Sequence, residues 1–392
     1  MAITNIKNSL KKNTILIALV VVMLFFQALI VAGGKGSLFA PANISNLISQ
    51  NAYVVVLASG MLLCILTGGN IDLSVGSIVA LVGAIAGTLI VNMHVNIYVG
   101  IVLCLLCGLL IGAWQGFWIA YVRIPPFIVT LAGMLLWRGV ALLVLNGLTI
   151  SPFPASYLRY FTSFLPISND KTLIFAVTVV IGVIVTLVYV ISQVTDRLKK
   201  QKKGYETGSS IMFIFKIAIT SVVVLLLFFL LAQNKGVPVV LIIIAVIVLV
   251  YSYFTSRTVP GRYLYALGGN EKAAKMSGIN TNRILFFAYA NMGFLSGVAA
   301  LMCVARFNSA APSAGTNYEL DAIASCFIGG ASAYGGTGTI SGAVIGAIFM
   351  GVLNNGMSIM GIDSNWQRAV KGLVLLAAVI FDVLSKNRKK SG

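Results

Sequence analysis

The chain is built from uninterrupted apolar runs, each about long enough to cross a lipid bilayer as a helix. A membrane-spanning helix needs about 20 apolar residues. The runs are continuous rather than alternating, so they predict helices and not the strands of a barrel. The sequence therefore predicts an all-α polytopic membrane protein with about 10–12 transmembrane helices, some of them short or broken. The expected spans are 14–33, 43–66, 74–92, 98–121, 127–148, 171–193, 213–232, 238–255, 283–304, 338–360 and 365–384.

Composition agrees with lipid as the solvent. Of the 392 residues, 59% are hydrophobic and only 9% are charged, against about 25% charged in an ordinary soluble domain. The net charge of +18 does not indicate nucleic-acid binding, because the Lys and Arg residues cluster in short segments between the apolar runs. That distribution is typical of cytoplasmic loops in a membrane protein. We therefore expect one transmembrane domain over residues 1–392 in a cytoplasmic (inner) membrane, with a first helix that is retained.

The basic segments predict the topology. The N-terminus, the segments Asp196–Glu206 and Arg257–Arg283, and the C-terminal tail all carry Lys or Arg, which places them in the cytoplasm. An even number of crossings must separate each pair of such segments. Only three long runs follow Arg283, so the short glycine-rich piece 322–333 must also cross, as a broken helix. The polar loops 151–171 and 306–321 then lie outside.

The sequence carries no signature of catalysis. It lacks the GxxxxGK[ST] loop that cradles nucleotide phosphates, and it lacks HExxH and GxSxG. With a single histidine, it predicts no metal site, no cofactor and no enzyme activity. Energy for active transport must then come from a partner or from an ion gradient.

Two ionisable residues within or beside apolar runs are candidate functional residues, because such groups are costly in a membrane unless paired, capped or wet. Asp72 lies just before an expected helix start, where a carboxylate can cap the helix; a proton or cation relay is the less favoured reading. Arg138 lies half-way along the span 127–148. It could hold backbone carbonyls or pair with a carboxylate, for which Asp72 is a candidate.

The cytoplasmic segment Gly261–Ile279 contains start and stop signals for a short helix. Asn270 suits an N-cap, Glu271 the first turn, Lys275 the far end, and Gly278 the C′ position. A helix over Glu271–Ser277 is too short to be stable alone in water. It therefore needs a surface to dock against, the alternative being a charged, solvated loop.

Glycines mark further features. Gly83 with Gly87, and Gly342 with Gly346, form GxxxG pairs that let helices approach closely. The segments Leu66–Gly69 and Ile328–Gly330 each end an apolar run and precede a glycine-rich helix. Repeated broken helices of this kind are common in transporters.

Several segments resemble monosaccharide permeases of the ribose, galactose and xylose ABC importers. They are Thr67–Ser77 (TGGNIDLSVGS), Ile124–Met134 (IPPFIVTLAGM) followed by Arg138-Gly139, Gly261–Ile279, Glu319–Ala324 (ELDAIA), and Ile328–Gly330 with Gly335-Gly336. The resemblance runs in order from about residue 40 to residue 384. Asn70 departs from several relatives, which have another residue or none there. Length and the basic loop near 196–212 look most like the xylose and multiple-sugar branch.

The resemblance implies partners and roles. The permease would pair with a second permease copy, two ATP-binding cassette subunits and an extracytoplasmic sugar-binding protein, with lipid around it and no nucleic acid. The loops near 151–170 and 306–321 would receive the binding protein. The segment 256–282 would be the coupling loop, and the residues that dock into the ATP-binding subunit would be Asn270, Glu271, Lys272, Ala273, Ala274, Lys275, Met276, Ser277 and Gly278.

Transport would proceed by alternating access. Sugar hydroxyls favour amides, hydroxyls and aromatic faces, although interhelical hydrogen bonding is the more frequent role of such side chains in a membrane. The candidate residues of the translocation path are Asn51, Asp72, Gln115, Arg138, Asn146, Asn291, Asn354 and Asn355. Two alternatives stay open: an ion-coupled secondary transporter that uses Asp72, and an ABC permease for a nucleoside or autoinducer.

Overall fold

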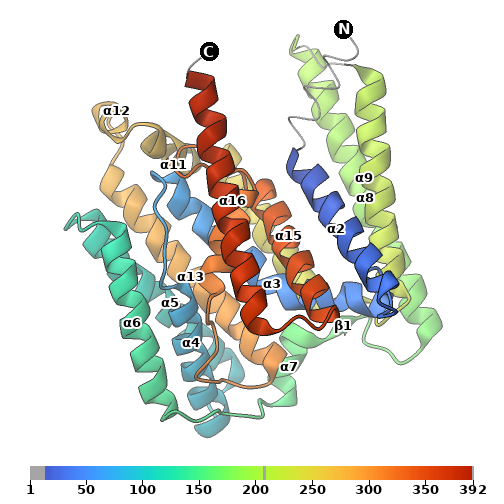
Figure 1. The fold of residues 1–392 in the computed structure, drawn as a ribbon, viewed down its shortest axis with the longest axis horizontal. Coiled ribbons are helices and arrows are strands. Elements are labelled where there is room, and N and C mark those ends of the chain that lie inside the picture. The colour runs from blue at the N-terminus through green and yellow to red at the C-terminus, as the bar shows by residue number, and fades with distance from the viewer. Residues whose placement is uncertain (1–13, 206–208, 391–392) are drawn as a thin grey trace.

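The computed structural model describes residues 14–205 and 209–390, and nearly all of its regular structure is helical (Figure 1). The helices are α2 (Thr14–Ala32), α3 (Pro41–Leu66), α4 (Val75–Ala86), continued by the π-helical η1 (Gly87–Asn92), α5 (Ile97–Ala120), α6 (Pro126–Leu145), α7 (Ala155–Thr162), α8 (Lys171–Lys202), α9 (Ser210–Ala232), α10 (Val239–Arg257), α11 (Val259–Gly269), α12 (Glu271–Met276), α13 (Thr281–Phe307), α14 (Tyr318–Ile328), α15 (Ile340–Ile359) and α16 (Ser364–Lys390). Two short antiparallel strands, β1 (Phe164–Leu165) and β2 (Val237–Pro238), join the loops before α8 and α10.

Ten helices in these described ranges are long and apolar enough to cross a membrane. They fall on the first ten expected spans, so the predicted fold class is confirmed. The last expected span, 365–384, is also helical within α16. It is not among the ten because charged residues, among them Lys371 and Asp382, interrupt it.

The start of α2, the end of α8, α12 and the end of α16 lie toward one edge of the bundle, at the top of Figure 1, and α7 lies toward the opposite edge. We call these the α12 edge and the α7 edge. The described parts of three basic segments that the sequence places in the cytoplasm, 196–205, 257–283 and the C-terminal tail, border on the α12 edge, and the basic N-terminus lies outside the described residues.

Helix α14 is long enough to span only about half of the hydrocarbon core of a membrane. Its 11 residues rise about 16 Å, against about 30 Å for the hydrocarbon core. The loop before α14 pairs with the loop before α7, through an antiparallel bridge between Ile150 and Ala310. The loop after it reaches the α12 edge, where the N–H of Gly336 donates to the carbonyl of Leu66 at 3.1 Å. The helix and its following loop together run from the α7 edge toward the α12 edge, and the broken crossing that they would form stays a prediction.

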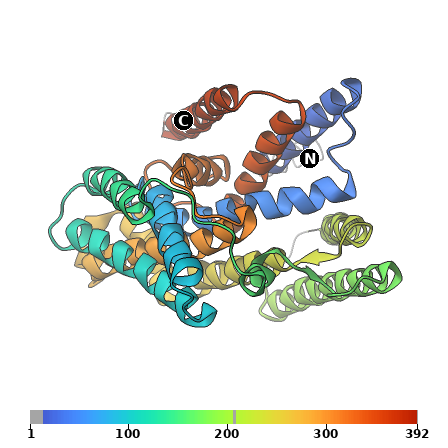
Figure 2. The ribbon, with the colours of Figure 1, turned by 90° about the horizontal axis from the view of Figure 1, so that it is seen from below.

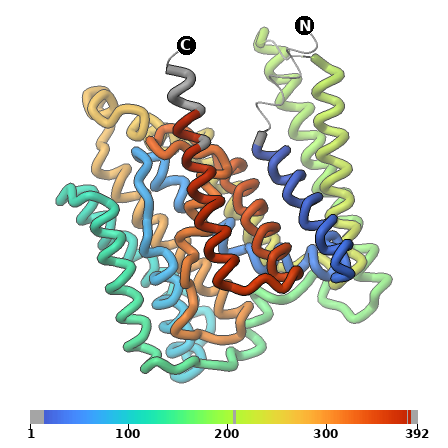
Figure 3. Tube along the Cα trace, viewed as in Figure 1, coloured from blue at the N-terminus to red at the C-terminus, as the bar shows by residue number. Residues whose placement is uncertain are grey.

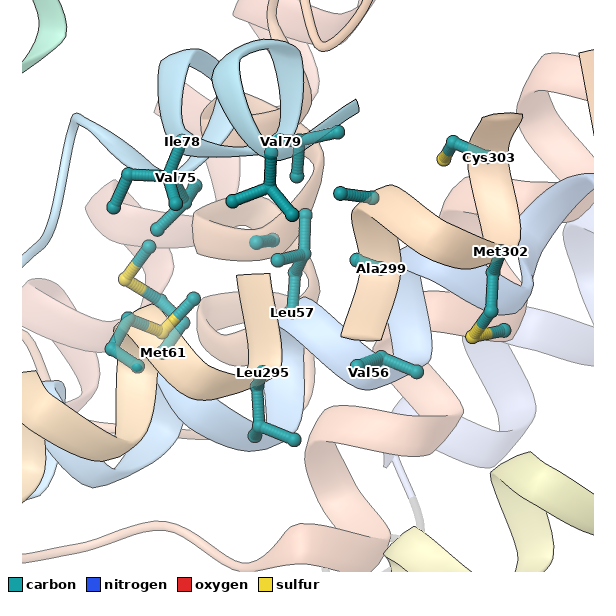
Figure 4. Packing of buried hydrophobic residues seen from close by; sticks show 14 of the residues in the cluster. Val56, Leu57, Met61, Val75, Ile78, Val79, Leu295, Ala299, Met302 and Cys303 are labelled. Carbon is teal, nitrogen blue, oxygen red and sulfur yellow. The ribbon is translucent and has the colours of Figure 1, made fainter. Parts of the chain in front are cut away.

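The core is formed by α3, α4 and α13, which are largely buried, while α8 and α9 expose most of their surface. Figure 4 shows side chains of α3, α4 and α13, such as Leu57, Val75 and Leu295, packed together. In Figures 2 and 3, α8 and α9 stand at the side of the molecule away from α6. Their exposed apolar faces suit contact with lipid.

The two glycine-rich breaks noticed in the sequence lie against each other. One is the loop 67–74 between α3 and α4, and the other is the loop 329–339 between α14 and α15. Gly69 has a φ of +75°, and a Cβ there would lie 1.9 Å from the carbonyl oxygen of Ala333. Only glycine permits this approach, so the repeat in sequence corresponds to a contact in space.

Candidate translocation path and docking helix

A cavity of about 230 Å³ opens near the α7 edge, between α3, α7, α10 and α13. Polar and aromatic side chains share its wall, including Asn46, Gln50 and Tyr53 from α3. Lys235 and Arg306 contribute two cations, and no carboxylate lines it. We call it the outer cavity. Ligand pockets are commonly concave and largely apolar, with a few convergent polar groups.

Tyr53 connects the outer cavity to a buried ion pair. Its hydroxyl donates to Oδ2 of Asp321 at 2.8 Å, and its ring stacks on Tyr318 with the centroids 3.9 Å apart. The ammonium of Lys371 lies 2.9 Å from Oδ1 of Asp321, whose side chain is only 2% exposed. A buried ion pair requires such extra hydrogen bonds to offset its desolvation. The pair joins the start of α14 to α16 and to the cavity wall.

Asp72 caps the chain just before α4. Its Oδ1 accepts hydrogen bonds from the backbone N–H of Ser74 at 2.9 Å and from the Ser74 hydroxyl at 2.6 Å. Gln115 extends this network by donating to Ser74 Oγ at 2.8 Å. The helix begins at Val75, two residues later than expected, so the carboxylate stands ahead of the helix. This geometry agrees with the capping interpretation.

Arg138 binds backbone rather than a carboxylate. Its Nη1 donates to the carbonyl of Pro312 at 3.2 Å and to that of Ala314 at 2.6 Å. The candidate pairing of Arg138 with Asp72 is wrong, because Asp72 is bound to Ser74. The interpretation of Arg138 as a residue that holds carbonyls is confirmed, and the carbonyls belong to the loop that leads into α14.

The remaining path candidates are dispersed among the helices. Asn51 donates to the carbonyl of Leu47 at 2.7 Å, and Asn355 exchanges hydrogen bonds with Asn43 at 2.9 and 3.0 Å. Asn291 accepts from the hydroxyl of Tyr251.

Two further asparagines complete the set. Asn146 ends α6 in a left-handed conformation and is exposed, and Asn354 is half-buried with no partner for its Oδ1 in the described residues. None of the eight path candidates lines the outer cavity, and their role in transport stays a prediction.

The cavity residues of α3 were missed, although the sequence contains a signal for them. Asn46, Ser49, Gln50 and Tyr53 recur at the spacing i, i+3, i+4, i+7, which places them on one face of a helix. A polar face on an apolar span indicates an aqueous or ligand-lined surface. Arg306 gave a weaker signal, since it closes α13 next to a polar loop.

Helix α12 forms as the sequence predicts, over Glu271–Met276 instead of Glu271–Ser277. The side chain of Asn270 accepts from the N–H of Ala273 at 3.0 Å. At the other end Gly278 has a φ of +82°, and the N–H of Ile279 returns to the carbonyl of Ala274 at 3.1 Å. This is the Schellman arrangement that ends helices at glycine.

One side of α12 is docked and the rest is open. Ala274 is buried against the body, and Lys272, Ala273, Lys275 and Met276 are exposed. Met276 is 89% exposed, an unusual position for a methionine side chain, which is more often buried.

Arg123, in the loop between α5 and α6, fixes the base of α12. Its Nη1 lies 2.6 Å from Oε1 of Glu271. Its Nη2 donates to Thr281 at 3.1 Å and also to Asn282, both at the start of α13. The sequence analysis did not single out Arg123, because nothing local indicates a partner 148 residues away.

Helix α11 links α12 to the break after α14. The hydroxyl of Tyr265 donates to the carbonyl of Gly338 at 3.0 Å, and burial raises the pKa of Tyr265, so the donor is present at neutral pH. A Cβ on Gly268 would lie 2.5 Å from the N of Gly336. Helix α11, which precedes α12, is therefore in direct contact with the loop 329–339.

The structure thus combines apolar spans, two glycine-rich breaks that contact each other, a polar cavity near the α7 edge and the short helix α12 at the α12 edge. This combination defines a membrane transport permease. The sequence model of the family described as branched-chain amino acid transport system / permease component matches residues 43–191 and 162–379. The chain belongs to this family, and it is a multi-pass protein of the bacterial inner membrane.

Individual proteins that are similar to this chain are described more narrowly than the family, as permeases for xylose or ribose. The xylose transport system permease protein XylH of Escherichia coli is 38% identical over 371 residues, which cover 95% of this chain and 91% of that protein. XylH of Haemophilus influenzae is 37% identical, with 97% and 98% covered. The ribose import permease protein RbsC of Escherichia coli is 35% identical, with 94% and 92% covered. No solved structure matches the chain.

Proposed function

We propose that this protein is the permease subunit of an ATP-driven importer that moves a monosaccharide, of the xylose type or of several kinds, across the inner membrane by alternating access. The observation that carries the proposal is the similarity to xylose and ribose permeases over more than nine-tenths of the chain. Family membership disfavours an ion-coupled secondary transporter, and the hydrogen bonds of Asp72 to Ser74 supply no proton path.

The energy for uptake comes from separate ATP-binding subunits. The permease functions with two of these, with a second copy of itself in the lipid bilayer, and with an extracytoplasmic sugar-binding protein. The outer loops around 151–170 and 306–321 receive the binding protein. The two outer loops contact each other through Ile150 and Ala310, which supports a shared receiving surface.

Helix α12 is the coupling helix of this importer. Its docked face and the ion pair of Glu271 with Arg123 hold its base, so the helix moves together with the α5–α6 loop and α13. Its open face presents Met276 flanked by Lys272 and Lys275. An apolar side chain between two cations suits a groove that has an apolar floor and an acidic rim.

Co-purification and uptake test the proposal together. The permease is expressed with the ATP-binding subunit from its own source, and the complex is reconstituted with the sugar-binding protein. We expect wild-type complex to accumulate xylose or ribose only with ATP. Met276→Asp on the open face of α12 should release the ATP-binding subunit, and Lys171→Glu, an exposed change of charge near the α7 edge, should not.

Two results would contradict the proposal. Retention of the ATP-binding subunit by Met276→Asp, with normal uptake, would remove the coupling role of α12. Sugar uptake that persists without the ATP-binding subunit and collapses with a protonophore would support the ion-coupled alternative. A complex that accumulates a nucleoside and no sugar would reassign the substrate class.

A further inference from the structure

We infer that the outer cavity is a monosaccharide-binding subsite within the permease itself, with Tyr53 as its aromatic wall and Gln50 and Arg306 as its hydrogen-bonding groups. The inference rests on the proposed function and goes beyond it, because it assigns a binding site to residues that the sequence analysis did not single out. It concerns the region where sugar arrives from the α7 edge.

Size is the first support. The cavity has a volume of about 230 Å³, well above the roughly 10–15 Å³ that a site for a single water requires. It is therefore large enough for several waters or for one compact sugar ring.

Chemistry is the second support. Gln50 and Arg306 are both half-buried and make no side-chain hydrogen bond among the described residues. Half-buried polar groups normally find partners, so unused donors and acceptors facing one cavity indicate a ligand that supplies hydroxyls. Asn46, on the same wall, is exposed. The aromatic rings of Tyr53 and Phe161 in the same wall offer the apolar faces that a sugar ring also requires.

The position of Tyr53 is the third support. Its ring is fixed by stacking on Tyr318 and by the hydroxyl bond to Asp321, and Asp321 is itself held by Lys371. A preorganised wall lowers the entropic cost of binding. The same hydrogen bond joins the cavity to the first turn of α14, so the subsite contacts the broken crossing directly.

The inferred ligand is a neutral sugar. Lys235 and Arg306 without a lining carboxylate would also accept a sugar acid, which is the competing ligand in the test. Lys235 lies over the ring of Phe164 at 5.8 Å, and Arg306 lies over that of Phe307 at 6.0 Å. Both cations thus have an aromatic ring near them, which stabilises a cation without an anion beside it.

The experiment uses the reconstituted complex and the permease in lipid nanodiscs. We expect Gln50→Ala and Arg306→Ala each to raise the xylose-loaded binding-protein concentration that gives half-maximal uptake, or to lower the uptake rate, by about threefold to tenfold, the effect of one or two hydrogen bonds. Arg368→Ala is the matched control, because Arg368 is exposed on α16, lies outside the two outer loops that receive the binding protein and does not line the cavity. Thermal unfolding of each variant checks that it is folded.

A direct binding measurement separates the subsite from the rest of the cycle. Saturation-transfer NMR on nanodiscs with millimolar xylose should give a signal for the wild type and for Arg368→Ala, and a weaker one for Gln50→Ala and Arg306→Ala. Equal signals and equal uptake in all four proteins would overturn the subsite. A signal from xylonate and none from xylose would overturn the neutral-sugar assignment. Absence of ATP-driven sugar uptake by the wild type would instead reject the proposed function.

Discussion

Asp72 is a fully buried carboxylate whose bonds all run through one oxygen. Oδ1 accepts from the Ser74 N–H and hydroxyl, while Oδ2 has no hydrogen-bond partner in the described residues. An asparagine in its place retains an acceptor at the position of Oδ1. A capping role needs only the hydrogen-bond acceptor, whereas a proton relay needs the ionisable carboxyl group. The asparagine variant therefore distinguishes the two roles.

We expect Asp72→Asn to retain most ATP-driven uptake, because the cap survives. Asp72→Ala should lose about 1–2 kcal/mol of stability, since two donors on Ser74 lose their acceptor. Uptake assays and thermal unfolding in detergent measure the two effects. Loss of uptake in a well-folded Asp72→Asn protein would restore the relay interpretation.

Asp321 and Lys371 form the buried ion pair that closes the wall behind Tyr53. Removing one partner leaves a buried charge, so Lys371→Met should destabilise the fold by about 3–5 kcal/mol. The double variant Asp321→Asn/Lys371→Met should recover a substantial part of that loss, because neither charge remains. Unfolding temperatures of the two singles and the double test the coupling, and strictly additive losses would argue against a direct interaction.

At the scale of elements, close contact between α14 and α15 depends on glycine. A Cβ at Gly346 would lie 1.9 Å from the carbonyl oxygen of Ser325, so the two backbones touch. The predicted role of Gly342 and Gly346 in close packing is thereby confirmed. The extensive contact of α5 with α13 uses glycines that the sequence analysis did not single out, among them Gly108 and Gly293.

Gly346→Ala should destabilise the protein by about 1–3 kcal/mol, because a rigid backbone oxygen cannot move aside cheaply. The matched control is Gly372→Ala in α16, where the added Cβ meets nothing within 4 Å. Thermal unfolding in detergent compares the two alanines. Equal stability of the two variants would show that α14 and α15 separate at little cost.

At the scale of the whole molecule, the topology depends on the short α14 and the loop after it. If this unit crosses, the loop between α15 and α16 lies outside with the loop before α8. In a cysteine-free background, we expect Asn365→Cys and Asn169→Cys to react with a membrane-impermeant maleimide in intact cells. Ser277→Cys on the α12 loop should react only after permeabilisation. Labelling of Asn365→Cys from the inside alone would mean that α14 does not complete a crossing.

The positions of the helices were predictable from sequence because they depend on local quantities, while the sidedness of the loops stays a prediction. Length and hydropathy determine a span, and charge determines the side of a loop. The caps of α12 are local too, so Asn270 and Gly278 indicated its ends within one residue. The polar face of α3 is equally local, because its polar residues recur at helical spacing, and this periodicity could have predicted the cavity wall.

The partners of these charged side chains, buried or exposed, were decided by the tertiary structure alone. Arg138 binds the carbonyls of Pro312 and Ala314, Asp321 binds Lys371, and Arg123 binds Glu271. Each contact joins residues far apart in the chain, so it depends on which helices pack together, and packing in lipid is set by shape and small residues more than by hydrophobicity. The sequence by itself thus determined the spans and the short helix α12, because both depend on local signals, while the cavity and its supporting ion pair arose only when the helices assembled.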